Sequence, residues 1–129
     1  MKLIIEKNEQ AMSESAMQII LGAMMQDKKV NISLTSGTSP RTMYKMMVPY
    51  VKDKPQFKDV DYYLFDEAPE VGELAGQPGP NWTEMQELFF KDANIPDEKI
   101  HCPSMENYET FDEEIAKAGA AHAEELAKM

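Results

Sequence analysis

The sequence predicts an α/β protein with a mostly parallel sheet, folded as one domain over residues 1–129. Short apolar runs of strand length alternate along the chain with longer segments whose apolar residues recur at helical spacing. This alternation favours right-handed crossover connections, which make neighbouring strands parallel. A chain of 129 residues with 43% hydrophobic residues is also long enough to bury a core of its own.

Four apolar runs are predicted to be strands, and the clearest of them lies near the middle of the chain. From Val60 onward this run is nearly continuous in apolar and aromatic residues, as expected of a strand that helices cover on both faces. The predicted strands are Lys2–Glu6, Val30–Leu34, Val60–Phe65 and Lys99–Cys102.

Two helices are predicted between the first three strands. Asn8 is a suitable N-cap for the first helix. The apolar residues that recur on one side of this helix are Met12, Ala16, Ile19, Ile20, Ala23 and Met24. The second helix is expected to start with Ser39 as N-cap and Pro40 at its first helical position, and to end at Pro49.

Two further helices are predicted in the second half of the chain. Asn81 is expected to cap the third helix, with Glu84 at the third position as in a capping box. The apolar stripe that starts at Trp82 is interpreted as core rather than as part of a cofactor site. The fourth helix is predicted from about Asn107.

Composition argues against several classes of partner and cofactor. Lys and Arg number 13 against 23 Asp and Glu, and this net charge of −10 argues against binding nucleic acid or an anionic membrane surface. No stretch approaches the roughly 20 apolar residues that a membrane span needs. Cys102 is the only cysteine, so we expect a reduced, cytoplasmic setting and no thiolate zinc cluster. His101 and His122 lack the neighbours of a catalytic triad or a metal site, and we predict neither a metal nor a cofactor.

The turn after the second predicted strand is the most informative segment. It consists of small residues and directly precedes a helix. Such a turn has free backbone N–H groups at the positive end of a helix dipole, which favours a phosphate or another anion. The residues expected to form this anion site are Ser36, Gly37, Thr38, Ser39 and Arg41. The alternative is a connecting turn without a ligand, followed by an ordinary surface cation.

Two acidic residues follow the third predicted strand. Asp66 and Glu67 lie at its carboxyl end, as the turn at Ser36 lies at the carboxyl end of the second strand. Ligands of parallel sheets bind beyond these ends, so we predict that the turn and Asp66 face a shared pocket. Both acids are candidate catalytic residues, because a carboxylate there can act as a general base. The alternative is an acid that caps a loop, and Glu67 is the more ambiguous of the two.

The segment Ala68–Pro80 is predicted to be an irregular loop. It holds three glycines and three prolines, too many turn-forming residues for regular structure. A loop of this length at the end of a strand is typical of a lid or a binding loop.

Several motifs together resemble a known enzyme family. They are the turn Ser36–Pro40, the strand Tyr62–Phe65 with Asp66 and Glu67 after it, and Asn94–Pro96 before Ile100. From Lys2 to about Ile115, their order and spacing are similar to the amino-terminal half of the glucosamine-6-phosphate deaminase (isomerase) and 6-phosphogluconolactonase superfamily. The resemblance implies a Rossmann-like, three-layer α/β/α fold, truncated relative to that of the family.

The resemblance also implies a reaction. The turn would hold the phosphate of a phosphorylated sugar, and Asp66 matches the acidic residue that abstracts a proton in the deaminases. A deaminase of this type opens the ring of an amino-sugar phosphate, moves a proton between C2 and C1, and releases ammonia. The lactonase alternative is the attack of water on a sugar-acid lactone.

Two features depart from the family pattern. Thr38 stands where members commonly carry a second glycine, and the chain ends at Met129 although members are roughly twice as long. Three expectations therefore stay open: an incomplete isomerase or deaminase, a phosphosugar-binding domain without turnover, and an interaction domain that kept only the fold. We expect at best weak catalysis by these 129 residues alone, and the open sheet edge favours a homo-oligomer.

Overall fold

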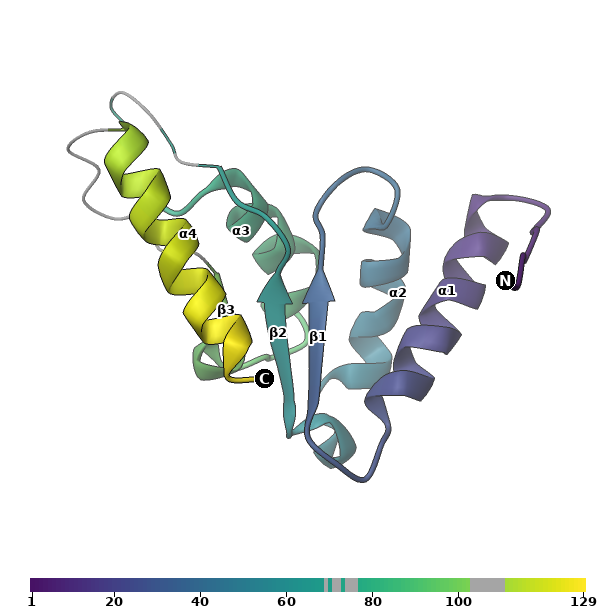
Figure 1. Cartoon of the computed structure of the whole chain (residues 1–129). Coiled ribbons are helices and arrows are strands. Elements are labelled where there is room, and N and C mark those ends of the chain that lie inside the picture. Colours follow the sequence, from purple (N-terminus) through teal and green to yellow (C-terminus); the bar gives the residue numbers. More distant parts are fainter. Residues whose placement is uncertain (69, 71–72, 74–76, 103–110) are drawn as a thin grey trace.

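A computed structural model describes residues 1–68, 70, 73, 77–102 and 111–129. Its regular elements confirm the predicted α/β class and the parallel sheet (Figure 1). In chain order they are α1 (Glu9–Met24), β1 (Val30–Leu34), α2 (Arg41–Val51), the 3₁₀ turn η1 (Pro55–Phe57), β2 (Val60–Leu64), α3 (Pro80–Met85), the π-helical segment η3 (Gln86–Phe90), the 3₁₀ turn η4 (Asp97–Lys99), β3 (Ile100–His101) and α4 (Phe111–Ala127).

The described strands form one parallel sheet in the order β1-β2-β3. β1 and β2 pair along their full length, from Val30 opposite Val60 to Leu34 opposite Leu64. β3 adds a short pairing on the other side of β2. These are three of the four predicted strands, with Phe65 now outside β2. Because the strands are parallel and in register, the turns after β1 and β2 leave the same end of the sheet.

The predicted first strand, Lys2–Glu6, is wrong. The segment pairs with none of the described strands, and Leu3 and Ile5 are largely exposed. α1, which follows this segment, packs against α2, and Figure 1 shows the amino terminus beyond α1, away from the sheet. The apolar pattern of the segment suits a strand, but the segment lies beyond α1 and does not pair with the open edge of β1.

The main core lies between one face of the sheet and the helical segments α2, α3 and η3. Tyr62 of β2 packs edge to face against Phe89 and Phe90, with ring centroids 5.7 and 5.6 Å apart. Tyr44 of α2 stacks on the same Phe89 at 6.4 Å. Phe89 of η3 is fully buried. Its ring contacts both β2 and α2 and therefore holds η3, α2 and the sheet together.

The segment η3 widens the apolar stripe that the sequence predicted. Regular helical spacing from Trp82 places Met85, Leu88 and Phe89 on one face, and all three are buried. The wider π turn also brings Phe90 into the core. Trp82 itself is half-buried and packs at the edge of this cluster.

The face that α1 presents to the core agrees only in part with the predicted one: Met24 is buried and Ala16 and Ile20 pack against the core. The predicted cap is confirmed, because Oδ1 of Asn8 accepts a hydrogen bond from the amide of Ala11 at 2.8 Å. The residues that α1 buries are Ser13, Met17 and Met24. Met12 and Ile19, both on the predicted face, are exposed. The difference arises because α1 packs against α2, a helix, and a helix-to-helix contact covers a narrower strip than a sheet does.

α2 is shifted by one or two residues from its predicted limits. Its N-cap is Pro40 rather than Ser39, and no side chain caps it. Pro49 lies inside the helix instead of ending it. The amide of Lys52 still donates to the carbonyl of Val48 at 2.9 Å, so the last turn closes although Pro49 has no N–H to donate.

α4 covers the opposite face of the sheet, which completes three layers (Figure 1). Nε2 of His122 donates to the carbonyl oxygen of Leu64 at 3.0 Å. Nδ1 of His101 lies 2.7 Å from Oε1 of Glu125. Both histidines therefore pack between the sheet and α4. The predicted start of this helix, near residue 107, lies outside the described residues.

Replacing Phe89 with alanine should lower the free energy of unfolding by about 3–5 kcal/mol, because it opens a cavity where three aromatic rings meet. Urea denaturation measures this change. Phe65→Ala is the matched control, since Phe65 is 72% exposed, and its effect should stay within about 0.5 kcal/mol. Equal losses in the two variants would contradict the placement of Phe89 in the core.

Candidate functional site

The turn after β1 and the acidic residues after β2 lie at the same end of the sheet. Hydrogen bonds to the side chain of Asn81 connect them. The hydroxyl of Ser36 donates to Oδ1 of Asn81 at 2.6 Å. Nδ2 of Asn81 donates in turn to the backbone carbonyl of Asp66 at 3.0 Å. One amide side chain therefore bridges the two loops, and it does so as acceptor on one side and donor on the other. Sequence analysis assigned no such role to Asn81.

The carboxylate of Glu67 is held by three backbone amides. Oε1 accepts from the amide of Ala68 at 2.9 Å and from that of Asn81 at 3.1 Å, and Oε2 accepts from that of Trp82 at 2.8 Å. The amides of Asn81 and Trp82 belong to the first turn of α3, so Glu67 caps this helix. A negative charge there also complements the helix dipole. This is the loop-capping arrangement that the sequence left open as the alternative for Glu67.

The predicted capping box at Asn81 is wrong. α3 begins at Pro80 with Gly79 as its N-cap, so Asn81 lies inside the first turn. Its side chain is used for the bridge between the loops, and Glu67 supplies the cap from 14 residues earlier in the chain. Capping patterns describe neighbours within one turn, and for this reason they do not predict a cap that arrives from another loop.

Arg41, the predicted cation of the anion site, is paired with Glu84. Its Nε lies 2.5 Å from Oε1 of Glu84, which joins the start of α2 to α3. The Arg41 side chain is 51% exposed. Exposed ion pairs contribute only about 0–1 kcal/mol, so an anion with two charges can compete with Glu84 for the guanidinium.

The turn after β1 is fixed at its start and open at its middle. The hydroxyl of Tyr44 donates to the carbonyl of Thr35 at 2.7 Å, and burial raises the pKa of Tyr44 to about 12, so this group stays a donor at neutral pH. Gly37 has a φ of 131°, in the left-handed region that favours glycine, and no atom lies within 4 Å of the position a Cβ would take. Thr38 and Ser39 are exposed. The turn therefore presents small, accessible groups to solvent.

The Asp66 side chain is exposed at the same end of the sheet. Close to it in the chain, an open hollow of about 360 Å³ is lined by Ser33, Thr35 and Phe65, which end β1 or follow β1 and β2. The structure thus brings together the loops that carry Ser36 and Asp66 and leaves the Asp66 carboxylate accessible. Whether both face one ligand stays a prediction.

Cys102 lies behind the capping carboxylate. Its Sγ is 3.8 Å from Oε2 of Glu67. Burial, together with the charge of Glu67, raises the pKa of the Cys102 thiol to about 12. The thiol is therefore un-ionised at neutral pH, and Cys102 packs against the core as a partly buried residue.

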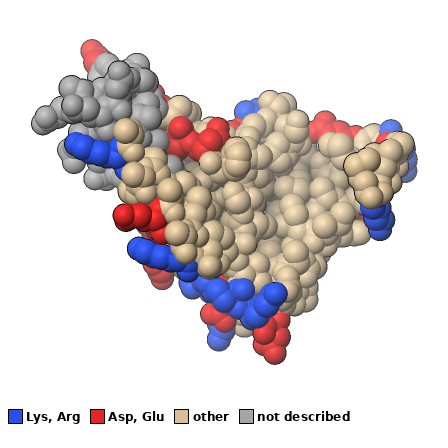
Figure 2. All heavy atoms as spheres, viewed as in Figure 1, with Lys and Arg blue, Asp and Glu red and all other residues tan. Residues whose placement is uncertain are grey.

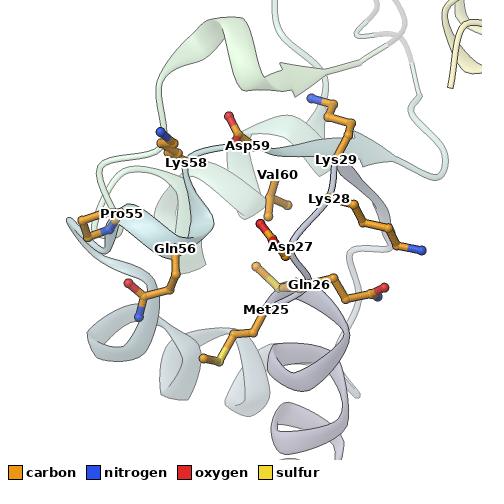
Figure 3. Close-up of a pocket in the computed structure, with 11 residues that line it drawn as sticks. Met25, Gln26, Asp27, Lys28, Lys29, Pro55, Gln56, Lys58, Asp59 and Val60 are labelled. Atoms are coloured by element: carbon orange, nitrogen blue, oxygen red, sulfur yellow. The ribbon is translucent and has the colours of Figure 1, made fainter.

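Two further cavities lie at the opposite end of the sheet. One of about 500 Å³ is lined by the segments Met24–Lys29 and Pro55–Val60, with Lys28, Lys29 and Asp27 at one side (Figure 3). A second, of about 300 Å³, lies between η1 and the turn Ala93–Pro96. Neither belongs to the predicted site.

The described part of the chain holds neither a metal cluster nor a membrane-spanning helix. No group of three or more His, Cys, Asp or Glu residues in it could hold a metal ion. None of its helices combines the length and apolarity that a bilayer crossing requires. The expected absence of a cofactor stays a prediction.

Sequence comparison finds glucosamine-6-phosphate deaminases. The chain is 36% identical over 107 residues to the enzyme of Lysinibacillus sphaericus, which is 82% of this chain and 44% of that protein. It is 29% identical over 126 residues to the enzyme of a Thermoanaerobacter species, covering 92% of this chain and 49% of that one. The chain thus spans about half the length of the curated relatives that it matches. No family model matches it.

Structural comparison agrees in fold. A monomeric glucosamine-6-phosphate deaminase superimposes with a TM-score of 0.72 at 14% identity, over 98% of this chain and 52% of the other. The 6-phosphogluconolactonase of Trypanosoma brucei gives a TM-score of 0.72 at 16% identity, over 98% of this chain and 49% of the other. At such low identity these matches establish the fold and nothing more.

The chain is a Rossmann-like α/β protein of the sugar-phosphate isomerase and deaminase type of fold. Its sequence is similar to glucosamine-6-phosphate deaminases and its fold also matches that of a 6-phosphogluconolactonase, in each case over about half the length of the other protein. The resemblance predicted from the motifs of the sequence is thereby confirmed.

Gly79→Ala should destabilise the protein by about 1–3 kcal/mol through forced overpacking. An added Cβ would lie 2.3 Å from Cδ of Glu67 and 2.6 Å from the carbonyl oxygen of Ala68, and the second of these is backbone that cannot rotate away. Thermal unfolding measures the effect. Gly22→Ala is the matched control: nothing lies within 4 Å of its added Cβ, and a helical alanine should be neutral or stabilising by up to about 1 kcal/mol. A neutral Gly79→Ala would mean that the Glu67 cap is not formed.

Glu67→Gln should increase the reactivity of the Cys102 thiol at pH 8, because removal of the negative charge lowers the pKa that Glu67 helps to raise. The rate of alkylation by iodoacetamide measures it. In the unchanged protein this rate should be well below that of a free cysteine, and Glu9→Gln, a change in the first turn of α1, should leave it unaltered. Equal alkylation rates in the Glu67→Gln variant and the unchanged protein would show that the charge of Glu67 does not affect the Cys102 thiol.

Proposed function

We propose that these residues form the sugar-phosphate-binding half of an isomerase or deaminase of the glucosamine-6-phosphate deaminase type, acting on a phosphorylated amino sugar in the cytoplasm. In this proposal residues 1–129 are one α/β domain. The observation that supports it most is the hydrogen-bonded bridge from Ser36 through Asn81 to Asp66. It connects the two loops that the chemistry would require to act together. The names of the curated relatives support the same substrate class.

In this proposal the turn after β1 binds the phosphate. Its backbone amides stand at the start of α2, which has no side-chain cap to occupy them. Ser36, Gly37, Thr38 and Ser39 would contribute amide and hydroxyl donors. Arg41 would exchange its carboxylate partner Glu84 for the phosphate, which adds charge and a directed hydrogen bond.

Asp66 is proposed as the base that moves a proton between C2 and C1 of the opened sugar. Its side chain is exposed at the end of the sheet where the phosphate turn lies. A carboxylate suits this step because it can accept a proton and return it to the neighbouring carbon. Loss of ammonia, with addition of water, then leaves a ketose phosphate. Glu67, with both oxygens bound to backbone amides, would hold the Asp66 loop in place rather than contact the sugar.

Two alternatives remain, and the first rests on the structural comparison. The fold is equally close to that of a 6-phosphogluconolactonase, so hydrolysis of a sugar-acid lactone is the second candidate reaction. A phosphosugar-binding domain without turnover would need only the turn and the bridge. Association through the outer edge of β1 also stays a prediction.

Calorimetric titration of the chain with glucosamine 6-phosphate tests the proposal. We expect a saturable heat that is absent with glucosamine, since the phosphate provides the charge that the turn binds. Stronger binding of 6-phosphogluconate than of glucosamine 6-phosphate would favour the lactonase alternative. Absence of saturable heat with either sugar phosphate would contradict a binding site at the turn.

Asn81→Asp serves as the sharpest variant in this titration. It keeps an acceptor for Ser36, loses the donor to the carbonyl of Asp66 and adds a negative charge beside the turn, so affinity for the phosphate should fall by more than the about threefold to tenfold of one hydrogen bond. Ser15→Ala on α1, far from the turn in the chain, is the control and should bind as the unchanged protein does.

A further inference from the structure

The helix α4 meets the sheet through few of its described side chains. Of the α4 residues whose side chains the structure describes, only His122 and Glu125 are not exposed. None of these described side chains belongs to the hydrophobic core. The helix nevertheless lies along one face of the sheet (Figure 1). Among the described residues, therefore, polar contacts hold α4 in its place.

Two of these polar contacts involve a histidine. Nε2 of His122 donates to the carbonyl oxygen of Leu64 at 3.0 Å, so Nδ1 of the neutral ring carries no proton. Nδ1 of His101, on β3, lies 2.7 Å from Oε1 of Glu125. Oε2 of the same carboxylate is 4.0 Å from Nδ1 of His122, which is beyond hydrogen-bond distance. Glu125 therefore faces both rings and is hydrogen-bonded to that of His101.

His101 lies between two carboxylates. Its other ring nitrogen, Nε2, is 3.7 Å from Oδ2 of Asp61. This nitrogen is buried and has no hydrogen-bond partner among the described residues. A neutral imidazole carries one N–H, so in either tautomer one ring nitrogen presents a lone pair to a negatively charged oxygen. Only the imidazolium, with an N–H at both nitrogens, interacts favourably with Glu125 and Asp61 together.

Two lysines share the charge of Asp61. Lys29, which precedes β1, and Lys99 of η4 both form ion pairs with it. Burial alone would raise the pKa of Asp61, but the hydrogen bonds and charges of these lysines outweigh burial and hold that pKa below its usual value. Several Lys or Arg side chains gather at this lower end of the molecule, where β1 and β2 begin (Figure 2). Asp61 is therefore ionised at neutral pH, and Glu125 is the stronger partner of His101.

The ring of Tyr63 stacks on the imidazole of His101. The centroids are 4.4 Å apart and the planes differ by 17°. Burial and the charges of Asp61 and Glu125 raise the pKa of Tyr63, so its hydroxyl is un-ionised. The thiol of Cys102, the next residue in the chain, is un-ionised as well. An aromatic face attracts a cation, so the stacked ring also favours the charged form of His101.

We propose that His101 takes up a proton from solvent when α4 packs on the sheet and that this proton makes the docking of α4 pH-dependent. The imidazolium donates to Glu125 of α4 and attracts Asp61 of β2. Burial of the ring, whose side chain is 18% exposed, opposes the charge, and the two carboxylates and Tyr63 offset this cost. The inference uses no residue of the proposed reaction and does not rest on it.

The direction of the effect follows from which state holds the proton. Below about pH 6.5 a histidine in an unfolded chain is already protonated, so the charged contact contributes in full. As the pH rises further, docked α4 has to keep or lose a proton that the free ring no longer holds, and docking weakens. Once the proton is lost, a lone pair of His101 faces a carboxylate.

Loosening of α4 would reach the candidate site through His122. The carbonyl group that His122 contacts belongs to Leu64, two residues before Asp66 in the chain. When α4 moves away, the end of β2 loses this hydrogen bond. The pH of the solution therefore acts on the support of the loop that carries Asp66.

Histidine side-chain NMR tests the protonation directly. His101 and His122 are the two histidines of the chain, so a His122→Gln variant assigns both signals. Long-range ¹H–¹⁵N spectra distinguish an imidazolium from each neutral tautomer. We expect His101 to remain an imidazolium at pH values where the histidines of the urea-unfolded chain are neutral. His122 should be the neutral tautomer with its proton on Nε2 under the same conditions.

Amide hydrogen exchange measures the docking of α4. The chemical exchange rate itself depends on pH, so the rates are converted to protection factors. The protection factors of the α4 amides should fall between about pH 6 and about pH 8, by up to about tenfold per pH unit, because opening is coupled to the release of one proton.

Four variants assign this pH dependence to residues. Glu125→Gln removes the charge at nearly constant size, and His101→Gln removes the titrating ring, so α4 protection should not depend on pH in either. Glu124→Gln removes the charge of an exposed neighbour on α4, is the matched control, and should retain the pH dependence. His122→Gln should retain it as well, because the proton resides on His101.

Three results would overturn the proposal. One is a His101 ring that loses its proton at the same pH as a histidine of the unfolded chain, or at a lower pH. Another is α4 protection that does not depend on pH in the unchanged protein. The third is a pH dependence that survives in His101→Gln. If Glu125→Gln leaves α4 unprotected at every pH, the NMR titration of the unchanged protein still decides. Because none of these measurements uses a sugar phosphate, failure here leaves the proposed function to its own test.

Discussion

The geometry of the candidate site depends on the contact between the carboxylate of Glu67 and the first amides of α3. Both oxygens of Glu67 are occupied by backbone donors, two of them from Asn81 and Trp82. This contact fixes the loop after β2 against the start of α3. Only then does the side chain of Asn81 reach the turn after β1 on one side and the carbonyl of Asp66 on the other. Without Glu67 the amides of Asn81 and Trp82 would have only water as hydrogen-bond acceptor. The loop after β2 would then no longer be held against α3, and the hydrogen-bonded bridge through Asn81 would be weakened.

The same contact decides which helix start can receive an external anion. Two helices begin near the carboxyl end of the sheet, α2 and α3. The positive end of α3 is already neutralised by Glu67, whereas α2 begins at an N-cap, Pro40, that offers no side-chain acceptor. A phosphate would therefore compete with a half-buried carboxylate at α3 but only with solvent and weak contacts at α2. This difference supports the proposal that an anion binds at the turn after β1.

The sequence predicted what is decided locally and missed what is decided by distant partners. The runs at Val30 and Val60 and the cap at Asn8 follow from residues within one element, and all three are confirmed. The strand at Lys2–Glu6 was predicted from the same kind of pattern, but a strand exists only where another strand is within reach. The cap of α3 comes from 14 residues away, and no spacing rule covers that distance.

The comparisons indicate where residue identity matters in this fold. Superposition with a TM-score of 0.72 at 14% identity shows that the arrangement of helices and strands depends on the pattern of buried and exposed positions rather than on particular side chains. A bridge such as that of Asn81 is different, because replacing one residue removes the hydrogen-bond partner of another group. Exchange of one apolar residue for another of similar volume is therefore compatible with the core around Phe89, whereas exchange of Ser36 or Asn81 removes a specific hydrogen bond. For this reason the fold was recognisable from apolar pattern, while the chemistry of the site has to be argued from individual hydrogen bonds.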